Sequence, residues 1–120
     1  MPSKKDYDKI YRLFELSIHG SGLPHPVREY RFNPDHKWAR CRRIDFFFPG
    51  HNLAVEIEGG AYSQGRHTRG CGFIADMEKY NEFVMQGFSL LRFTPDQVKS
   101  GYALQEIERW FKTIGLKSAL

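Results

Sequence analysis

Apolar residues recur with a helical period in three parts of the chain. A spacing of three or four positions places them on one face of each segment, which is the pattern of an amphipathic helix. These helices are predicted over about residues 4–19, 73–86 and 102–114. The residues predicted to face inward are Tyr7, Ile10, Tyr11, Phe14 and Ile18 in the first helix, Phe73, Met77, Tyr80, Asn81 and Val84 in the second, and Leu104, Ile107, Phe111 and Ile114 in the third.

Four other segments alternate or form short apolar runs, and each predicts a strand. PGHN at 49–52 is predicted to join the second strand to the third as a tight turn. The apolar FSLLRF segment predicts a central strand. The order helix–strand–strand–strand–helix–strand–helix predicts one α/β (α+β) domain over residues 1–120, a mixed sheet flanked by helices. The predicted strands cover about residues 27–32, 40–48, 53–58 and 88–93.

Three carboxylates, Asp45, Glu56 and Glu58, interrupt the most strand-like stretch, RIDFFFPGHNLAVEIE. Burying an unpaired carboxylate is costly, so a buried patch of this kind has to be neutralised. If the turn pairs Phe48 with Leu53, the alternation of side chains puts Asp45 directly opposite Glu56. The same register puts Arg43 opposite Glu58.

Three interpretations of this acidic patch follow from the residues alone. Arg43 could neutralise Glu58 and leave Asp45 and Glu56 to share a proton. The face could instead be exposed to solvent. In the third interpretation a divalent cation lies between Asp45, Glu56 and Glu58, and the oxygen ligands favour Mg²⁺ or Mn²⁺ over zinc. Glu15, at the edge of the apolar face of the first helix, is a candidate for a fourth oxygen ligand.

Basic residues flank the acids along the chain, whose formal net charge is +4. This balance favours a polyanionic partner such as DNA. The alternative is that the bases are salt-bridge partners or a solvated face. The candidates for DNA contact are Lys37, Arg40, Arg42 and Arg43 before Asp45, and Arg66 and Arg69 in the glycine-rich loop after Glu58.

The acids and the segments that follow them resemble the PD-(D/E)xK nuclease superfamily. Asp45 occupies the first acidic position of that motif and Glu56 the second. EIEGGAYSQGRHTRGCGF and DMEKYNEFVMQGFSLLRFT are similar to small phage-type endonucleases, in particular Holliday-junction resolvases. The resemblance implies a restriction-endonuclease-like core of order αβββαβ and Mg²⁺- or Mn²⁺-dependent hydrolysis of a phosphodiester.

The sequence departs from the family pattern at two positions. Ile44 stands where the motif has Pro, and Glu58 stands where it has the lysine that orients the attacking water or neutralises charge. Glu58 could bind a second metal ion, or a cation from elsewhere could replace the lysine. Lys79 is one candidate, although a helical wheel puts it on the polar side of its helix. His67 is another, as a general base or a phosphate contact.

The resemblance implies a structure-selective DNA endonuclease, most specifically a resolvase that cuts four-way junctions symmetrically and leaves 5′-phosphates. Paired nicks imply a homodimer with two-fold symmetry, and Phe46, Phe47 and Trp38 are candidates for its surface. The alternatives are a nicking endonuclease for mismatched or damaged DNA, similar to very-short-patch repair enzymes, and a non-catalytic nucleic-acid-binding module.

The chain has no apolar run near the roughly 20 residues of a membrane span. Its first residues lack the apolar region and cleavage site of a signal peptide. We therefore expect no membrane partner and a cytoplasmic protein, in a bacterium or in a phage-infected host.

Overall fold

The computed structural model describes residues 3–32, 43–58 and 70–115. Within these ranges the predicted helices and strands are confirmed, with bounds that shift by a few residues, and one short helix was not predicted. The elements are α1 (Lys4–Gly20), β1 (Val27–Arg31), β2 (Arg43–Phe48), β3 (Leu53–Ile57), α2 (Gly70–Met85), β4 (Ser89–Phe93), α3 (Pro95–Lys99) and α4 (Tyr102–Trp110), followed by a π-helical turn, η4 (Phe111–Gly115).

The four strands form one mixed sheet in the order β1-β2-β3-β4. β1, β2 and β3 are antiparallel neighbours, and β4 returns parallel to β3 after the α2 crossover. The predicted hairpin register is confirmed, because Phe48 pairs with Leu53 across the turn. These features fit a general α/β class with a mixed sheet and flanking helices.

The predicted central position of the FSLLRF strand is wrong, because β4 lies at one edge of the sheet that the described residues form. Its apolar residues have a different origin. Leu91 packs against the core on one face of the sheet and Leu90 against the core on the other. A strand covered by helices on both faces is apolar throughout even when only one strand neighbours it.

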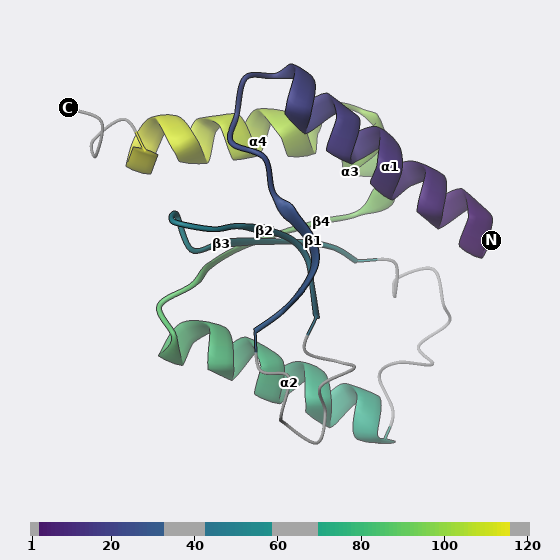
Figure 1. Cartoon of the computed structure of the whole chain (residues 1–120). Coiled ribbons are helices and arrows are strands. Elements are labelled where there is room, and N and C mark those ends of the chain that lie inside the picture. The colour runs from purple at the N-terminus through teal and green to yellow at the C-terminus, as the bar shows by residue number, and fades with distance from the viewer. Residues whose placement is uncertain (1–2, 33–42, 59–69, 116–120) are drawn as a thin grey trace.

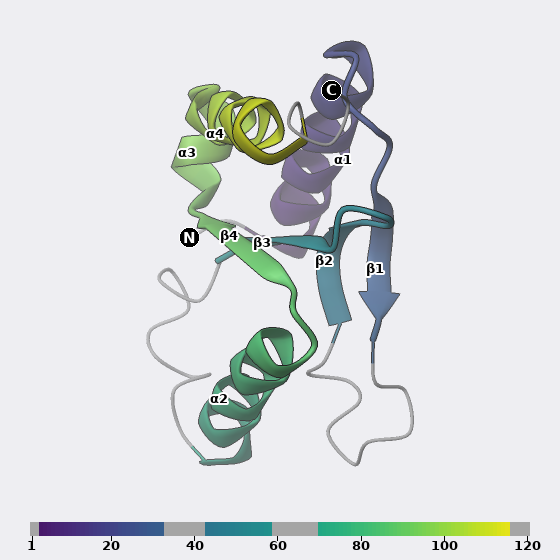
Figure 2. The ribbon, with the colours of Figure 1, turned by 90° about the vertical axis from the view of Figure 1, so that its left-hand side faces the viewer.

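Helices cover both faces of the sheet. α1, α3 and α4 lie on one side and α2 on the other (Figure 1; Figure 2). The larger core, between the sheet and α1 and α4, contains Phe14, Phe46 and Ile107. The smaller core lies between the sheet and α2 and contains Phe47, Ala54 and Phe83. None of the helices in the described ranges combines the length and the apolar composition that a membrane span requires.

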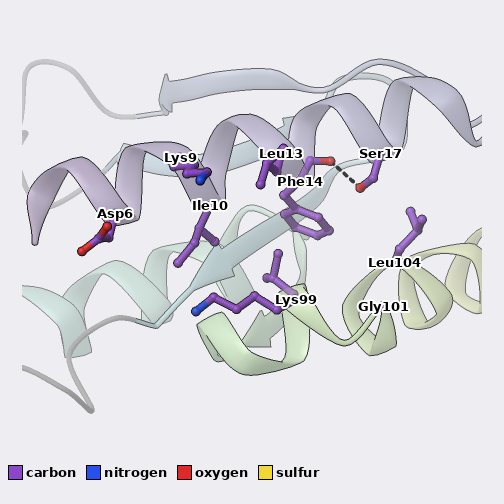
Figure 3. A pocket seen from close by; sticks show the side chains of 10 residues that line it. Asp6, Lys9, Ile10, Leu13, Phe14, Ser17, Lys99, Gly101 and Leu104 are labelled. Carbon is purple, nitrogen blue, oxygen red and sulfur yellow. Dashed lines mark hydrogen bonds between the residues drawn. The ribbon is translucent and has the colours of Figure 1, made fainter. Parts of the chain in front are cut away.

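A hollow of about 690 Å³ opens between α1 and the α3–α4 segment (Figure 3). Apolar side chains such as Leu13 and Leu104 line part of it, and Lys9 and Lys99 lie at its polar end. The hollow is formed by helices on one side of the sheet and contains no residue of the acidic patch.

The predicted inward face of α2 is largely wrong. Met77 and Val84 are 53% and 78% exposed, whereas Lys79 is buried. Tyr80 does pack against the smaller core, together with the buried Phe83. The face of α2 turned toward the sheet carries Phe83 together with Lys79, which contacts Glu56 on β3, and Tyr80, which donates to Glu58 just after β3. A count of apolar residues alone does not include these two polar contacts.

Ile114 is also exposed rather than inward-facing. The helical wheel assumes one continuous α-helix to residue 114. The structure instead changes to a π-helical turn at Phe111, and the wider turn rotates later residues away from the positions that an α-helix would give them. Phe111 itself is buried as predicted.

Glu29 interrupts the alternation of β1 with a left-handed backbone conformation, φ 52°. Arg28 packs toward α1, over the Phe46 ring. Tyr30, two residues later, packs toward α2 and stacks on Phe47 with ring centroids 4.5 Å apart. Side chains two apart in a regular strand share one face, so the twist at Glu29 is what sends Arg28 and Tyr30 to opposite faces.

We expect Glu29→Gly to stabilise the protein by about 1 kcal/mol, because glycine adopts positive φ without a Cβ clash. The ion pair that this change removes, between Glu29 and Arg43, is 3.5 Å in length and exposed, and it contributes little. Urea unfolding measures the change, and Glu29→Ala is the control, since it removes the carboxylate and keeps the Cβ. A glycine variant no more stable than the alanine variant would contradict strain at this position.

Candidate active site

Asp45 and Glu56 lie side by side where the ladder between β2 and β3 ends. The paired residues run from Phe48–Leu53 to Phe46–Val55. Beyond that point the acidic side chains bond to the neighbouring backbone instead. The N–H of Ile57 donates to Asp45 Oδ2 at 2.8 Å, and the N–H of Asp45 lies 3.4 Å from Glu56 Oε2. The predicted juxtaposition of these two acids is confirmed.

Glu56 is buried and Asp45 is half-buried. Glu56 is only 4% exposed, and its burial raises the pKa to about 8, against a lowering by Lys79 and a further rise from the charge of Asp45. Burial also raises the pKa of Asp45, while the N–H of Ile57 lowers it. The interpretation that this face is simply solvated is therefore wrong for Glu56.

Lys79 on α2 supplies a positive charge to the acid pair. It is 7% exposed, and its Nζ contacts Glu56 Oε1. The predicted position on the polar side of its helix is wrong, because α2 turns this side chain toward the sheet. A lysine from the crossover helix thus places its ammonium group directly against Glu56.

Glu58 has partners that sequence analysis did not identify. Its Oε1 accepts hydrogen bonds from the Tyr80 hydroxyl at 2.9 Å and from Arg92 Nε at 3.0 Å. The Arg92 guanidinium lies 4.7 Å from the centre of the Tyr80 ring. Arg43, the predicted partner of Glu58, pairs with Glu29 instead. In the parallel β3–β4 register, Arg92 lies beside Glu56 on the neighbouring strand. Only that strand pairing could have revealed Arg92 as a partner of Glu58.

Tyr11, predicted only as a core residue, borders the acids from α1. It is half-buried, and burial together with the charges of Asp45 and Glu56 raises the pKa of its phenol. Tyr80 shows the same direction, since burial and the charge of Glu58 raise its pKa. Both phenols therefore keep their protons at neutral pH and act as hydrogen-bond donors toward an anion.

Of the remaining predicted residues, some lie within the described ranges and the others lie outside them. Glu15 lies on α1, where its Oε1 is 3.5 Å from Arg28 Nη1. Phe46 and Phe47 are 0% and 5% exposed, so their predicted place on a dimer surface is wrong, because both fill the cores. The others lie outside the described residues, namely Lys37, Trp38, Arg40, Arg42, Arg66, His67 and Arg69.

The chemistry of the donors fits a divalent cation at Asp45 and Glu56. Two adjacent carboxylates offer the hard oxygen ligands that Mg²⁺ and Mn²⁺ prefer, and a cation would offset the cost of ionising them in a buried place. Within residues 3–32, 43–58 and 70–115, no three His, Cys, Asp or Glu side chains converge as a ligand group. Glu58 as a third ligand stays a prediction.

The raised pKa of Glu56 predicts how the metal-free protein responds to pH. The folded state keeps a proton to about pH 8, whereas an ordinary glutamate loses it near 4.5. The proton's contribution to stability is therefore complete below the ordinary pKa and is lost as the pH rises through about 8. We expect the Tm in EDTA to fall across this window and Glu56→Gln to flatten the fall. If the Tm of the glutamine variant fell with pH as steeply as that of the wild type, the proton would belong to another group.

No protein-family model, curated protein or solved structure matches this chain.

Proposed function

We propose that the protein is a metal-dependent, structure-selective DNA endonuclease, most specifically a homodimeric Holliday-junction resolvase that leaves 5′-phosphates. One observation carries the proposal. Lys79 reaches the acid pair from α2 and contacts Glu56 beside Asp45. Two acids and a lysine are the functional groups of the resembled nucleases, and here three separate elements bring them together.

Each residue of the site has a distinct task in this mechanism. Asp45 and Glu56 would hold Mg²⁺ or Mn²⁺, which when bound polarises the phosphoryl oxygen, lowers the pKa of a water and stabilises the leaving 3′-oxygen. Lys79 provides the charge that orients the attacking water and balances Glu56. Tyr80, the next residue on α2, is tied to Glu58 and so fixes the helical turn that carries Lys79.

The observation also bears on the alternative functions. A non-catalytic module is an alternative because Glu58 replaces the motif lysine. Lys79 beside Glu56 weakens that alternative, since a buried lysine at an acid pair costs desolvation that a binding module has no need to meet. The contact does not favour a junction over a mismatch, so a mismatch-nicking endonuclease stays the second candidate.

The function is tested with labelled four-way junction, mismatched duplex, nicked duplex and plain duplex, each with Mg²⁺ and with EDTA. We expect paired symmetric nicks in the junction only, and only with Mg²⁺. Nicks confined to the mismatch would favour the second candidate, and binding without cleavage would favour a module. Light scattering is expected to give twice the 14.0 kDa of one chain, and a monomer on junction DNA would contradict the resolvase.

Arg66 and Arg69, which lie outside the described residues, give a separate prediction about DNA contact. We expect the Arg66→Ala, Arg69→Ala double variant to bind junction DNA more weakly. The slope of log affinity against log salt should fall by about 1 for each phosphate that an arginine no longer neutralises. Arg109→Ala on α4 is the control, because Arg109 is paired with Glu106. If the double variant showed the same slope of log affinity against log salt as the control, Arg66 and Arg69 would not contact the DNA backbone.

A further inference from the structure

Arg28 is a cation on β1, near Tyr11 and Phe46, that sequence analysis did not assign to the site. It lies on β1 opposite Phe46, and Phe46 directly follows Asp45. Its guanidinium carbon is 4.8 Å from the centre of the Phe46 ring and 5.2 Å from that of Tyr11. The guanidinium therefore lies close to two aromatic rings, between α1 and the sheet.

The hydrogen-bonding capacity of Arg28 is poorly used. Its Nη1 is 3.5 Å from Glu15 Oε1, longer than a good N–H···O bond. Its Nε is buried and has no acceptor among the residues that the structure describes. About 30% of the side chain is still exposed. An arginine held beside two aromatic rings, with one loose carboxylate contact and part of its side chain exposed, is prepared to bind a planar or tetrahedral oxyanion.

The other cations near the acids are already paired. Lys79 contacts Glu56, and Arg92 donates to Glu58, both from the α2 and β4 side of the site. Arg28 approaches from the α1 and β1 side, and its charge acts on the same Tyr11 phenol as the charges of Asp45 and Glu56. Lys79 and Arg92 thus have close acidic partners, whereas Arg28, on the α1 side, has only the longer contact to Glu15.

We propose that Arg28 binds a phosphate of the DNA strand that crosses the acid pair, next to the phosphate that is cut. The proposal rests on the proposed function. It makes the α1–β1 side of the site a substrate-binding surface, with Arg28 as its binding residue. The Tyr11 hydroxyl, for which no hydrogen bond to a described residue is seen, lies beside it as a further donor.

The test compares Arg28→Met and Arg28→Lys with Arg109→Met, which removes one positive charge from α4. Junction affinity is measured by fluorescence anisotropy in EDTA at several salt concentrations, and single-turnover cleavage is measured at saturating DNA in Mg²⁺. We expect Arg28→Met to weaken binding about tenfold and to reduce the salt slope by about 1. Arg28→Lys should keep the slope and lose affinity severalfold, because lysine lacks the planar fork. Cleavage at saturating DNA should fall less than affinity.

Thermal melts of each variant separate binding from packing. If Arg28→Met melts lower but binds junction with the affinity and slope of the wild type, Arg28 is only a clamp between α1 and β1, and the proposal is overturned. If Arg28→Met does not fold, Arg28→Lys decides, and wild-type affinity in that variant overturns the proposal. If the wild-type protein binds none of the four DNA substrates, the proposed function fails and Arg28 loses its role with it. If the wild-type protein cleaves the junction and Arg28→Met binds it with wild-type affinity and salt slope, the proposed function stands and only the role of Arg28 is overturned.

Discussion

Replacing Lys79 with methionine is expected to slow single-turnover cleavage by about 10²–10³-fold, the cost of removing one positioned group that stabilises charge in a transition state. Methionine keeps most of the buried stem and removes the charge. Glu56 is then left buried without its cation, so its pKa should rise further and it should hold its proton more firmly. A protonated Glu56 is a poor metal ligand, and metal affinity should therefore fall together with the rate.

Two further variants show whether the loss is catalytic. Lys79→Arg restores the charge with a different shape and should recover part of the rate. Lys99→Met makes the same chemical change at an exposed lysine on α3 and should leave cleavage unchanged. Rates are measured at saturating Mg²⁺ and junction DNA, with a thermal melt of each variant. A Lys79→Met protein that cleaves at the wild-type rate would show that the buried lysine serves packing alone.

Asp45→Asn is expected to reduce cleavage by several orders of magnitude while the fold survives. The amide oxygen of asparagine can still accept the Ile57 N–H that Asp45 accepts at 2.8 Å, so the local backbone keeps its bond. The charge that would hold a divalent cation is lost. Because burial already raises the pKa of Asp45, and like charges side by side destabilise a sheet, the metal-free Tm should stay level or rise.

Asp45→Ala separates the charge from the hydrogen bond. Alanine removes both, and the unsatisfied Ile57 N–H should cost about 1–3 kcal/mol. Calorimetric Mg²⁺ titration should show weakened binding in both variants, whereas melts in EDTA should show a loss of stability in the alanine variant only. Junction binding by Asp45→Asn should survive or tighten, since one negative charge near phosphate has gone. An asparagine variant that melts lower in EDTA yet cleaves at the wild-type rate would remove Asp45 from the active site.

The local pattern of the chain was sufficient to predict the acid pair. A tight turn at 49–52 fixes how β2 meets β3, and strand alternation then sets which side chains meet across the hairpin. Asp45 and Glu56 are only eleven residues apart, so their meeting depends on one turn and on no long-range packing. α1 and its buried residues Ile10, Phe14 and Ile18 were also predicted correctly, because the spacing of apolar residues along one helix is likewise a local property of the chain.

The partners of those acids were decided by the tertiary structure. Lys79 and Arg92 reach the site only after the α2 crossover places β4 beside β3 and turns one face of α2 toward the sheet. A helical wheel ranks faces by apolar content. It therefore misplaced Lys79, whose burial is compensated by an acid on another element rather than by its own neighbours.

Arg28 shows the same division within a single strand. The sequence VREYR predicts an alternating strand with Arg28 and Tyr30 on one face. The left-handed conformation of Glu29 sends them to opposite faces, and Arg28 meets Tyr11 and Glu15 on α1. The sequence alone determined the acid pair because local backbone geometry fixes short-range contacts. Only the tertiary structure decided which cations neutralise and extend that pair, because those contacts depend on how the crossover and α1 pack.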